Sequence, residues 1–424
     1  MRLEGGRGKR AQGLQGALMC RPSRLAEEGN AVTKVKTGLD VWVEQGFSAL
    51  KGKRVGAIVN PTSVDARFRH LADLLSGADG VTLAALFGPE HGIRGEAQYM
   101  VAVDEAKDRR TGVPVYSLYG STFESLSPRQ ESLQGLDALV FDIQDVGSRY
   151  YTYVYTMALA MKAAAKARVP FYVLDRPNPL NGVAMEGNLV GEGFRSFVGL
   201  YALPNRHGMT AGELARLFNV QEGFGCELTV VPCEGWRRGQ FWSETGLPFI
   251  SPSPNMPTAD TALVYPGMCL GEGTNVSEGR GTCRPFEQFG APWVDTDQLL
   301  ARLAKEELPG VAFRAVGFTP TFDKYTGQSC NGAFIHVTDR EAFQPLRTGV
   351  AIFQTLHDIG PGSFDWRADA YEFVEDVPAF DLLCGTDQVR RGIEAGWPLE
   401  RLLEGFSAQT ETFARHRTSY LLYA

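Results

Sequence analysis

From residue 54 onward, short runs of apolar and β-branched residues alternate with longer stretches of helical spacing. This alternation constrains the fold more than any other feature, because it is typical of a parallel sheet whose crossover connections are helices. The apolar runs predict strands at 54–60, 81–87, 113–119, 138–143, 170–174 and 227–232. The stretches between them predict helices at 66–76, 128–134, 151–168 and 210–220. We therefore expect an α/β domain with a Rossmann-like, mostly parallel sheet.

The second half of the chain has a different pattern. Four prolines interrupt any periodicity over 234–262, which makes this stretch the predicted hinge between domains. Tyr265–Pro285 is Gly-rich and too irregular for a core helix, so we expect a long site loop there. The remaining helical stretches lie at 296–307, 341–358, 386–395 and 400–417, and the strand-like runs at 311–318 and 333–337.

Three regions follow from these patterns. Residues 1–36 are predicted to be a disordered or over-extended tail, and residues 37–250 a Rossmann-like catalytic domain. Residues 251–424 are predicted to form a smaller, auxiliary α+β domain that closes the site cleft.

Composition and charge exclude several classes of protein. The 424 residues carry 42 Lys and Arg against 49 Asp and Glu, a net charge of −7, which is the wrong sign for a nucleic-acid binder with a basic surface. No apolar run approaches the ~20 residues that a membrane-spanning helix needs. The scattered cysteines show no zinc-site spacing and fit a reducing compartment. Since the first residues are too polar for a convincing signal peptide, we expect a cytoplasmic location; a periplasmic or secreted one stays open if the true start differs.

The segment FGPEHGIRG, residues 87–95, is the most informative polar cluster. It follows a predicted strand, and ligands of open α/β sheets bind outside the carboxyl ends of the strands. Proline and glycine define the turn from which Glu90, His91 and Arg94 project. This trio suits general acid/base chemistry near an anionic ligand. A structural turn in which Glu90 pairs with Arg94 is an equally supported alternative.

Two further strand ends carry polar side chains. The strand at 138–143 delivers Asp142, Gln144 and Asp145 to the same rim, followed by Arg149 and Tyr151. An acidic residue inside a strand needs a partner, so a structural role for Asp142, paired with one of two arginines, is slightly favoured over catalysis. The next strand end presents three more candidates, Asp175, Arg176 and Asn178.

Residues 206–214 contain one more candidate and one expected cap. His207 lies in a candidate site loop. Thr210 and Glu213 have the spacing of a capping box, so we expect Glu213 to cap a helix rather than to catalyse.

The Gly-rich loop of the second half offers Glu272, Asn275, Glu278 and Arg280. Glycine there lets the backbone approach a ligand closely. As a dinucleotide fingerprint the loop fails, because Gly-x-Gly-x-x-Gly is not completed at Val276. A long solvated loop without a ligand is the alternative.

Six motifs in order make the chain similar to the NamZ-type exo-β-N-acetylmuramidases, a bacterial family: GPEHGIRG (88–95), FDIQDVGSRYYTY (141–153), DRPNPLNG (175–182), RHGMTAGEL (206–214), SPNMP (253–257) and EGTNVSEGRGTCRPFEQFG (272–290). The resemblance runs from about residue 37 to the C-terminus. It implies a glycosidase of cell-wall recycling that releases β-1,4-linked N-acetylmuramic acid from the non-reducing end of peptidoglycan fragments. It also implies a cleft between a Rossmann-like domain and an auxiliary domain, with Glu90 as the favoured catalytic carboxylate.

Glycoside hydrolysis uses two carboxyl groups. We expect Glu90 to be the general acid and His91 to orient it or bind substrate. For the second carboxylate, Asp145 is marginally preferred over Asp142, Glu272 and Glu278.

The substrate suggests the other roles. The lactyl carboxylate of muramic acid calls for a cation, and Arg280 is preferred to Arg149 and Arg176. Asn275, Asn178 and Gln144 would meet hydroxyl and acetamido groups. The other predicted substrate-binding residues are Arg94, Tyr151, Asp175 and His207. This scheme needs muramyl saccharides as partners and neither a metal nor a nucleotide.

Two alternatives remain. The first is an NAD- or nucleotide-linked sugar enzyme, which is disfavoured because Asn60-Pro61-Thr62 stands where a glycine fingerprint would follow the first strand. The second is a non-catalytic protein that binds cell-wall fragments.

Overall fold

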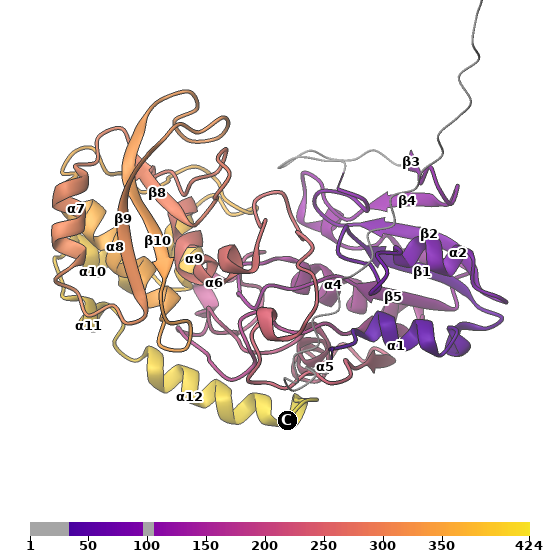
Figure 1. Cartoon of the computed structure of the whole chain (residues 1–424). Helices are drawn as coiled ribbons and strands as arrows, with labels where there is room; N and C mark the ends of the chain where they lie inside the picture. The colour runs from indigo at the N-terminus through magenta and orange to yellow at the C-terminus, as the bar shows by residue number, and fades with distance from the viewer. Residues whose placement is uncertain (1–33, 96–105) are drawn as a thin grey trace, which may run out of the picture. The chain divides into compact units, whose positions relative to one another are not determined.

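The structure, a computed structural model, describes residues 34–95 and 106–424. The predicted tail over 1–36 therefore lies outside the described residues, except for its last three positions. A seven-stranded sheet occupies the first half, in the order β3-β4-β2-β1-β5-β6-β7 (Figure 1). Its strands are β1 (Arg54–Val59), β2 (Thr82–Gly88), β3 (Ala106–Lys107), β4 (Pro114–Ser117), β5 (Ala138–Asp142), β6 (Phe171–Leu174) and β7 (Leu228–Val231).

The predicted Rossmann-like sheet is confirmed. All six predicted strands form, and they pair in parallel, whereas β3 runs antiparallel to β4 at the edge. Every residue of β5 is buried, as expected for a parallel strand covered on both faces.

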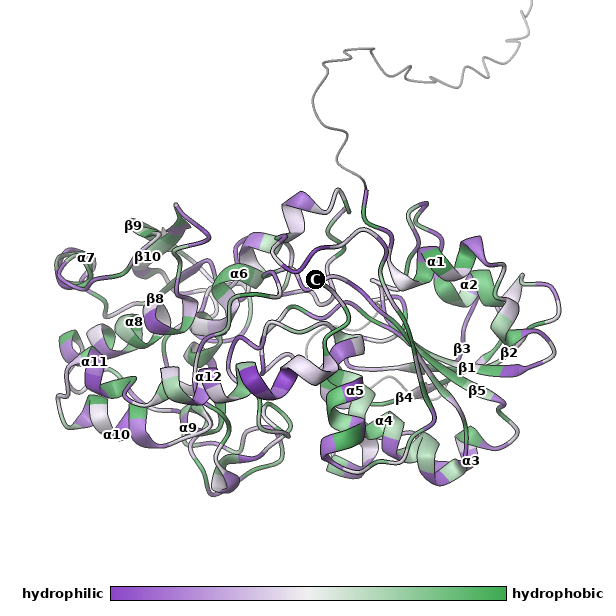
Figure 2. Ribbon diagram, turned by 90° about the horizontal axis from the view of Figure 1, so that it is seen from below, coloured by the Kyte–Doolittle hydropathy of each residue, from purple (hydrophilic) through white to green (hydrophobic). Residues whose placement is uncertain are grey.

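Helices cover both faces of this sheet, as Figure 2 shows. One face carries α1 (Gly38–Glu44) and α2 (Leu71–Ser76), and the other carries α3 (Gln130–Leu133), α4 (Tyr153–Ala167) and α5 (Ala211–Gln221). The predicted helix at 66–76 starts only at Leu71, because the His70 side chain caps α2 by accepting the Ala72 N–H. The predicted capping box at the start of α5 is present.

The second half forms a smaller α+β arrangement, as predicted. Its antiparallel sheet has the order β8-β10-β9, with β8 (Gln288–Ala291), β9 (Val311–Phe318) and β10 (Cys330–Val337). Its helices are α6 (Ala259–Met268), α7 (Thr296–Leu303), α8 (Pro345–Ile359), α9 (Ala379–Cys384), α10 (Gln388–Glu394), α11 (Leu399–Leu402) and α12 (Phe406–Arg417). Short 3₁₀ helices lie at η1 (Ser48–Leu50), η2 (Phe123–Leu126), η3 (Glu192–Phe194), η4 (Trp242–Glu244), η5 (Cys269–Gly273) and η6 (Thr418–Tyr420). In the described ranges, no helix is both long enough and apolar enough to cross a bilayer.

Two predictions about helices in this half are wrong. The single helix expected at 400–417 is two helices, because Gly405 adopts a φ of 83° between them. A loop is expected from Tyr265 onward. Instead, α6 continues through Pro266, and η5 follows it. Packing outweighs the unfavourable local sequence here, since α6 lies against α8 with Gly267 at the contact.

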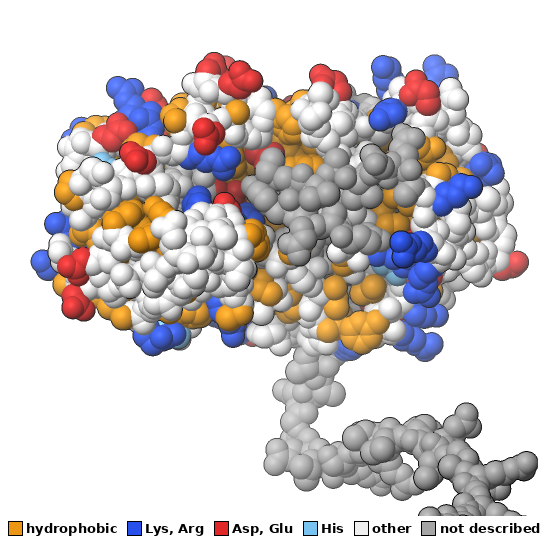
Figure 3. All heavy atoms as spheres, turned by 90° about the horizontal axis from the view of Figure 1, so that it is seen from above, with side chains coloured by type: hydrophobic (Ala, Val, Ile, Leu, Met, Phe, Trp, Pro, Cys, Tyr) orange, Lys and Arg blue, Asp and Glu red, His pale blue; other side chains and the backbone are white. Residues whose placement is uncertain are grey.

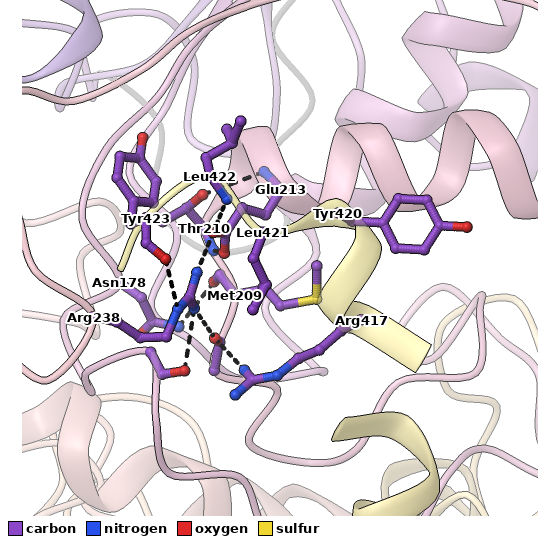
Figure 4. Close-up of polar contacts among 12 residues, drawn as sticks. Asn178, Met209, Thr210, Glu213, Arg238, Arg417, Tyr420, Leu421, Leu422 and Tyr423 are labelled. Atoms are coloured by element: carbon purple, nitrogen blue, oxygen red, sulfur yellow. Dashed lines mark hydrogen bonds and ion pairs between the residues drawn. The ribbon is translucent and has the colours of Figure 1, made fainter. Parts of the chain in front are cut away.

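The C-terminal segment folds back onto α5 (Figure 4). Arg238 forms a buried ion pair with Glu213, and the N–H of Leu422 donates to the same carboxylate over 2.8 Å. Arg417 donates to the backbone carbonyls of His207, at 3.2 Å, and Gly208. Glu213 thus joins the helix that it caps to the end of the chain.

The close contact between α6 and α8 yields a stability prediction. A Cβ at Gly267 would collide with the carbonyl of Pro345, which is backbone and cannot turn aside. We expect Gly267→Ala to lower the free energy of unfolding by ~2 kcal/mol or more, measured by urea denaturation. Gly239→Ala, where a Cβ meets no atom within 4 Å, is the matched control. Equal midpoints for the two variants would contradict the packing described.

Candidate active site

A cavity beyond the carboxyl end of β2 brings the two halves of the chain together. The space between its lining atoms has a volume of about 610 Å³, and part of this volume is open to solvent. In Figure 3, acidic and basic side chains lie close together near the middle of the face drawn. The lining comprises Glu90, His91, Tyr150, Tyr151, Thr152, Tyr153, Val198, Ser253, Asn255, Met256, Tyr265, Glu272, Arg280, Phe286, Tyr371 and Glu372.

The turn after β2 presents Glu90 as the sequence predicts. His91 has a φ of 73° and Gly92 a φ of 78°, so the chain passes through two left-handed residues just after Glu90. The imidazole of His91 is buried, and its Nε2 lies 3.9 Å from Oε1 of Glu90. The Tyr153 hydroxyl donates to the backbone carbonyl of Glu90 over 3.4 Å. Backbone and neighbours together fix the position of this carboxylate.

On the other side of the cavity, Arg280 lies between two carboxylates. Its Nη2 is 2.6 Å from Oε1 of Glu272, and its Nε is 2.9 Å from Oε1 of Glu278. The Lys324 ammonium contacts the second oxygen of Glu278 at 2.8 Å. Lys324 and Arg280 hold the pKa of Glu278 below its usual value. Tyr371 completes the group by donating its hydroxyl to Oε2 of Glu272 over 2.8 Å.

Glu372 is a lining carboxyl that the sequence analysis missed. Burial, together with the charges of Glu90 and Glu272, raises the pKa of Glu372 to about 8. One signal was available, because the connection between α8 and α9, residues 360–378, is long for a chain segment without regular structure. Ser253, Asn255 and Met256 were also missed as site residues, although they belong to the SPNMP motif.

Several predicted site residues lie elsewhere. Arg94 binds Asp108 through Nε at 2.8 Å and Asp73 through Nη2 at 2.8 Å, and it is not among the described residues that line the cavity. Arg94 holds the pKa of Asp108 well below its usual range. Arg94 therefore fastens the turn after β2 to its surroundings, and its role in binding substrate stays a prediction.

The carboxylates at the end of β5 also have structural partners. Asp142 is fully buried and receives two bonds from Arg176, at 2.6 and 3.0 Å, which is the arrangement slightly favoured from sequence. Oδ2 of Asp145 accepts the N–H of Gly147 and lies 3.3 Å from Nε2 of His207. Neither carboxylate is in the described lining of the cavity, and the role of Asp145 as second carboxylate stays a prediction.

The remaining candidates serve the packing of loops. Arg149 is fully buried among backbone carbonyls. Gln144 and Asn178 donate to carbonyls of neighbouring loops, and Asn275 is bonded to the backbone at 363 and 365. Asp175 accepts the Thr210 hydroxyl and the Gly212 N–H at the start of α5. Among the predicted site residues that the structure describes, those that line the cavity are Glu90, His91, Tyr151, Glu272 and Arg280.

The chain has a Rossmann-like sheet with a carboxyl-lined cavity at its strand ends, and a smaller α+β portion completes that cavity. These features define a class of α/β enzymes. Within that class the chain belongs to the NamZ family of exo-β-N-acetylmuramidases. The model of the family's N-terminal part matches residues 55–260, and the model of its C-terminal part matches residues 263–423.

Known proteins of similar sequence and structure agree. The peptidoglycan β-N-acetylmuramidase NamZ of Bacillus subtilis (strain 168) is 46% identical over 390 residues, which cover 92% of both chains. Two crystal structures of DUF1343 family proteins from Bacteroides fragilis NCTC 9343 superpose with TM-scores of 0.83 and 0.73, at 36% and 30% identity. Each covers 92% of this chain and 99% of its own.

The buried pair at the end of β5 yields a prediction. Arg176→Met leaves the Asp142 carboxylate buried without its partner, so we expect the free energy of unfolding to fall by ~3–5 kcal/mol, measured by urea denaturation. As a control, Arg302→Met removes an exposed ion pair to Asp358 and should change stability by less than ~1 kcal/mol. A small loss in Arg176→Met would show that Asp142 does not depend on this arginine.

Proposed function

We propose that this protein hydrolyses the β-1,4 bond of an N-acetylmuramic acid unit at the non-reducing end of peptidoglycan fragments. Membership of the NamZ family supports this activity. One structural observation carries the proposal: Glu90 from the first half and Arg280 from the second line the same cavity. The proposal retains the two-domain division at about residue 250, which is supported because each sheet lies within one half.

Glu90 is proposed as one of the two carboxyl groups that glycoside hydrolysis needs. The turn after β2, the adjacent His91 imidazole and the Tyr153 hydroxyl hold it in place. Tyr151, Tyr265 and Phe286 also line the cavity, and their rings pack edge to face on one another, so the wall that they form is apolar.

Arg280 is proposed to receive the lactyl carboxylate of muramic acid. Its guanidinium is the one Arg or Lys head group in the described lining. A planar guanidinium binds a carboxylate through two hydrogen bonds, which a lysine ammonium cannot reproduce.

The first test of the function is Glu90→Gln. The wild-type protein should release free N-acetylmuramic acid from the disaccharide in which it is β-1,4-linked to N-acetylglucosamine. The variant should lose at least ~100-fold in kcat/KM, because an amide can neither donate nor accept the proton involved. Release of the sugar is measured by chromatography. A folded wild-type protein that binds the disaccharide and releases no sugar would favour a non-catalytic binder and overturn the proposal.

The second test concerns specificity. We compare Arg280→Lys with the wild-type protein on two aryl glycosides, a β-N-acetylmuramide and a β-N-acetylglucosaminide that lacks only the lactyl group. The preference for the muramide, expressed as a ratio of kcat/KM values, should fall by roughly 10-fold or more in the variant. The loss of one charge-assisted hydrogen bond costs about 1.5–3 kcal/mol, and that free energy corresponds to a change of roughly this size in kcat/KM. An unchanged ratio would assign lactyl recognition to another residue.

A further inference from the structure

Glu372 differs from the other glutamate on its side of the cavity. Glu272 is bound by Arg280 at 2.6 Å and by the Tyr371 hydroxyl at 2.8 Å. For the half-buried Glu372 carboxyl, the described part of the chain supplies neither a hydrogen bond nor an ion pair, although the side chain lines the cavity. A carboxyl group in this situation is available to a ligand.

The backbone holds Glu372 at the tip of a tight turn. The N–H of Tyr371 donates to the carbonyl of Val374 over 2.9 Å, and the reverse bond measures 3.0 Å. The two residues between them, Glu372 and Phe373, have φ values of 46° and 69°. A turn with two left-handed central residues favours glycine or asparagine, and other residues are strained in it. Strain of this kind persists where the surroundings impose it, as they often do at functional sites.

Neighbouring side chains lock the turn in place. The Tyr371 hydroxyl is bonded to Glu272 on η5, and the Arg367 guanidinium lies 5.3 Å from the centre of the Tyr371 ring. The turn and η5 are therefore fixed to one another, and Glu372 cannot leave the cavity without breaking these contacts.

The charges around Glu372 favour its neutral form. Glu90 faces it from the turn after β2 and Glu272 from η5, and both raise the pKa of Glu372, to about 8 together with burial; Arg367 opposes them. Arg280 and Lys324 are already matched by Glu272 and Glu278. Two nearby carboxyl groups cannot both ionise easily, so one keeps its proton.

We propose that Glu372 is the proton donor of the reaction, and that Glu90 supplies the second carboxyl group as a carboxylate. This inference rests on the proposed function and reassigns the donor role, which the sequence analysis predicts for Glu90. It agrees with the general rule that a glycosidase separates its two carboxyl groups into an acid and a base through their environments.

The proposed step balances. The bond between the anomeric carbon and the glycosidic oxygen breaks, and its electron pair stays on the oxygen. That oxygen takes the proton of Glu372 and departs as an alcohol. One water molecule is consumed overall: its hydroxyl group is bonded to the anomeric carbon at the end, and its other proton restores Glu372.

The experiment uses the full chain and two substrates with different leaving groups. One is the disaccharide, whose leaving alcohol needs a proton, and the other is 4-nitrophenyl β-N-acetylmuramide, whose leaving group departs without one. We expect Glu372→Gln to lose at least ~100-fold in kcat on the disaccharide and less than ~10-fold on the aryl glycoside. Glu90→Gln should lose activity on both substrates. Glu375→Gln, an exposed glutamate on the same segment, is the matched control and should keep both activities.

A pH profile gives an independent readout. With the disaccharide, kcat/KM of the wild-type protein should fall as the pH rises through about 8, because the donor loses its proton there. The residual activity of Glu372→Gln on the same disaccharide should lack this fall. Glu372→Asp keeps an acid in the turn and should retain the alkaline fall at a reduced rate, which protects the test if the glutamine variant folds poorly.

The outcomes separate the two proposals. A wild-type protein that cleaves neither substrate overturns the proposed function. If the wild-type protein cleaves both substrates and Glu372→Gln is impaired equally on both substrates or on neither, the role of Glu372 is overturned. The proposed function then still stands.

Discussion

The cavity depends most on the contacts that the buried guanidinium of Arg149 makes. Arg149 follows β5, is fully buried, and donates to the carbonyl of Leu203 at 2.9 Å in the first half and to that of Leu383 at 2.7 Å in the second. Burial lowers the pKa of this arginine. A guanidinium that is shielded from water needs hydrogen-bond acceptors from the protein, so the carbonyl groups around Arg149 must stay in place. Because Tyr150 and Tyr151 follow directly in sequence and line the cavity, the same contact positions part of its wall.

A second constraint is the way charge is distributed around the cavity. Arg280 and Lys324 neutralise Glu272 and Glu278, and Tyr371 uses the remaining oxygen of Glu272. The network pairs both of these cations with carboxylates of the protein. Because both cations are matched, burial and the charges of Glu90 and Glu272 decide the pKa of Glu372, and they raise it. If Glu372 donates the proton, as proposed, this network contributes by keeping Arg280 and Lys324 paired with other carboxylates.

The sequence could predict what local rules determine. Periodicity located all six parallel strands, the Thr210 capping box identified Glu213 as a cap, and the turn after β2 placed Glu90 at the cavity. The sequence could not predict which side chains from distant segments pair with one another. The residues that hold Arg94 and Asp142 come from separate segments, with Asp73 on α2, Asp108 after β3 and Arg176 after β6, and only tertiary contact shows these pairings. Glu372 escaped because a turn with left-handed Glu and Phe has no sequence signature; the residues that usually mark such turns are absent.

The division of the two carboxyl groups between the halves has a physical consequence. A like-charge interaction weakens with distance and with exposure to water, so Glu90 raises the pKa of Glu372 only while the turn after β2 and the Tyr371–Val374 turn face each other across a partly dry cavity. Alone, a glutamate would be ionised at neutral pH and useless as a donor. The acid is therefore a property of the assembled site rather than of a residue. Separating the two turns would expose Glu372 to water and remove it from Glu90, both of which lower its pKa, so the donor role proposed for it depends on the contacts that hold the turns in place.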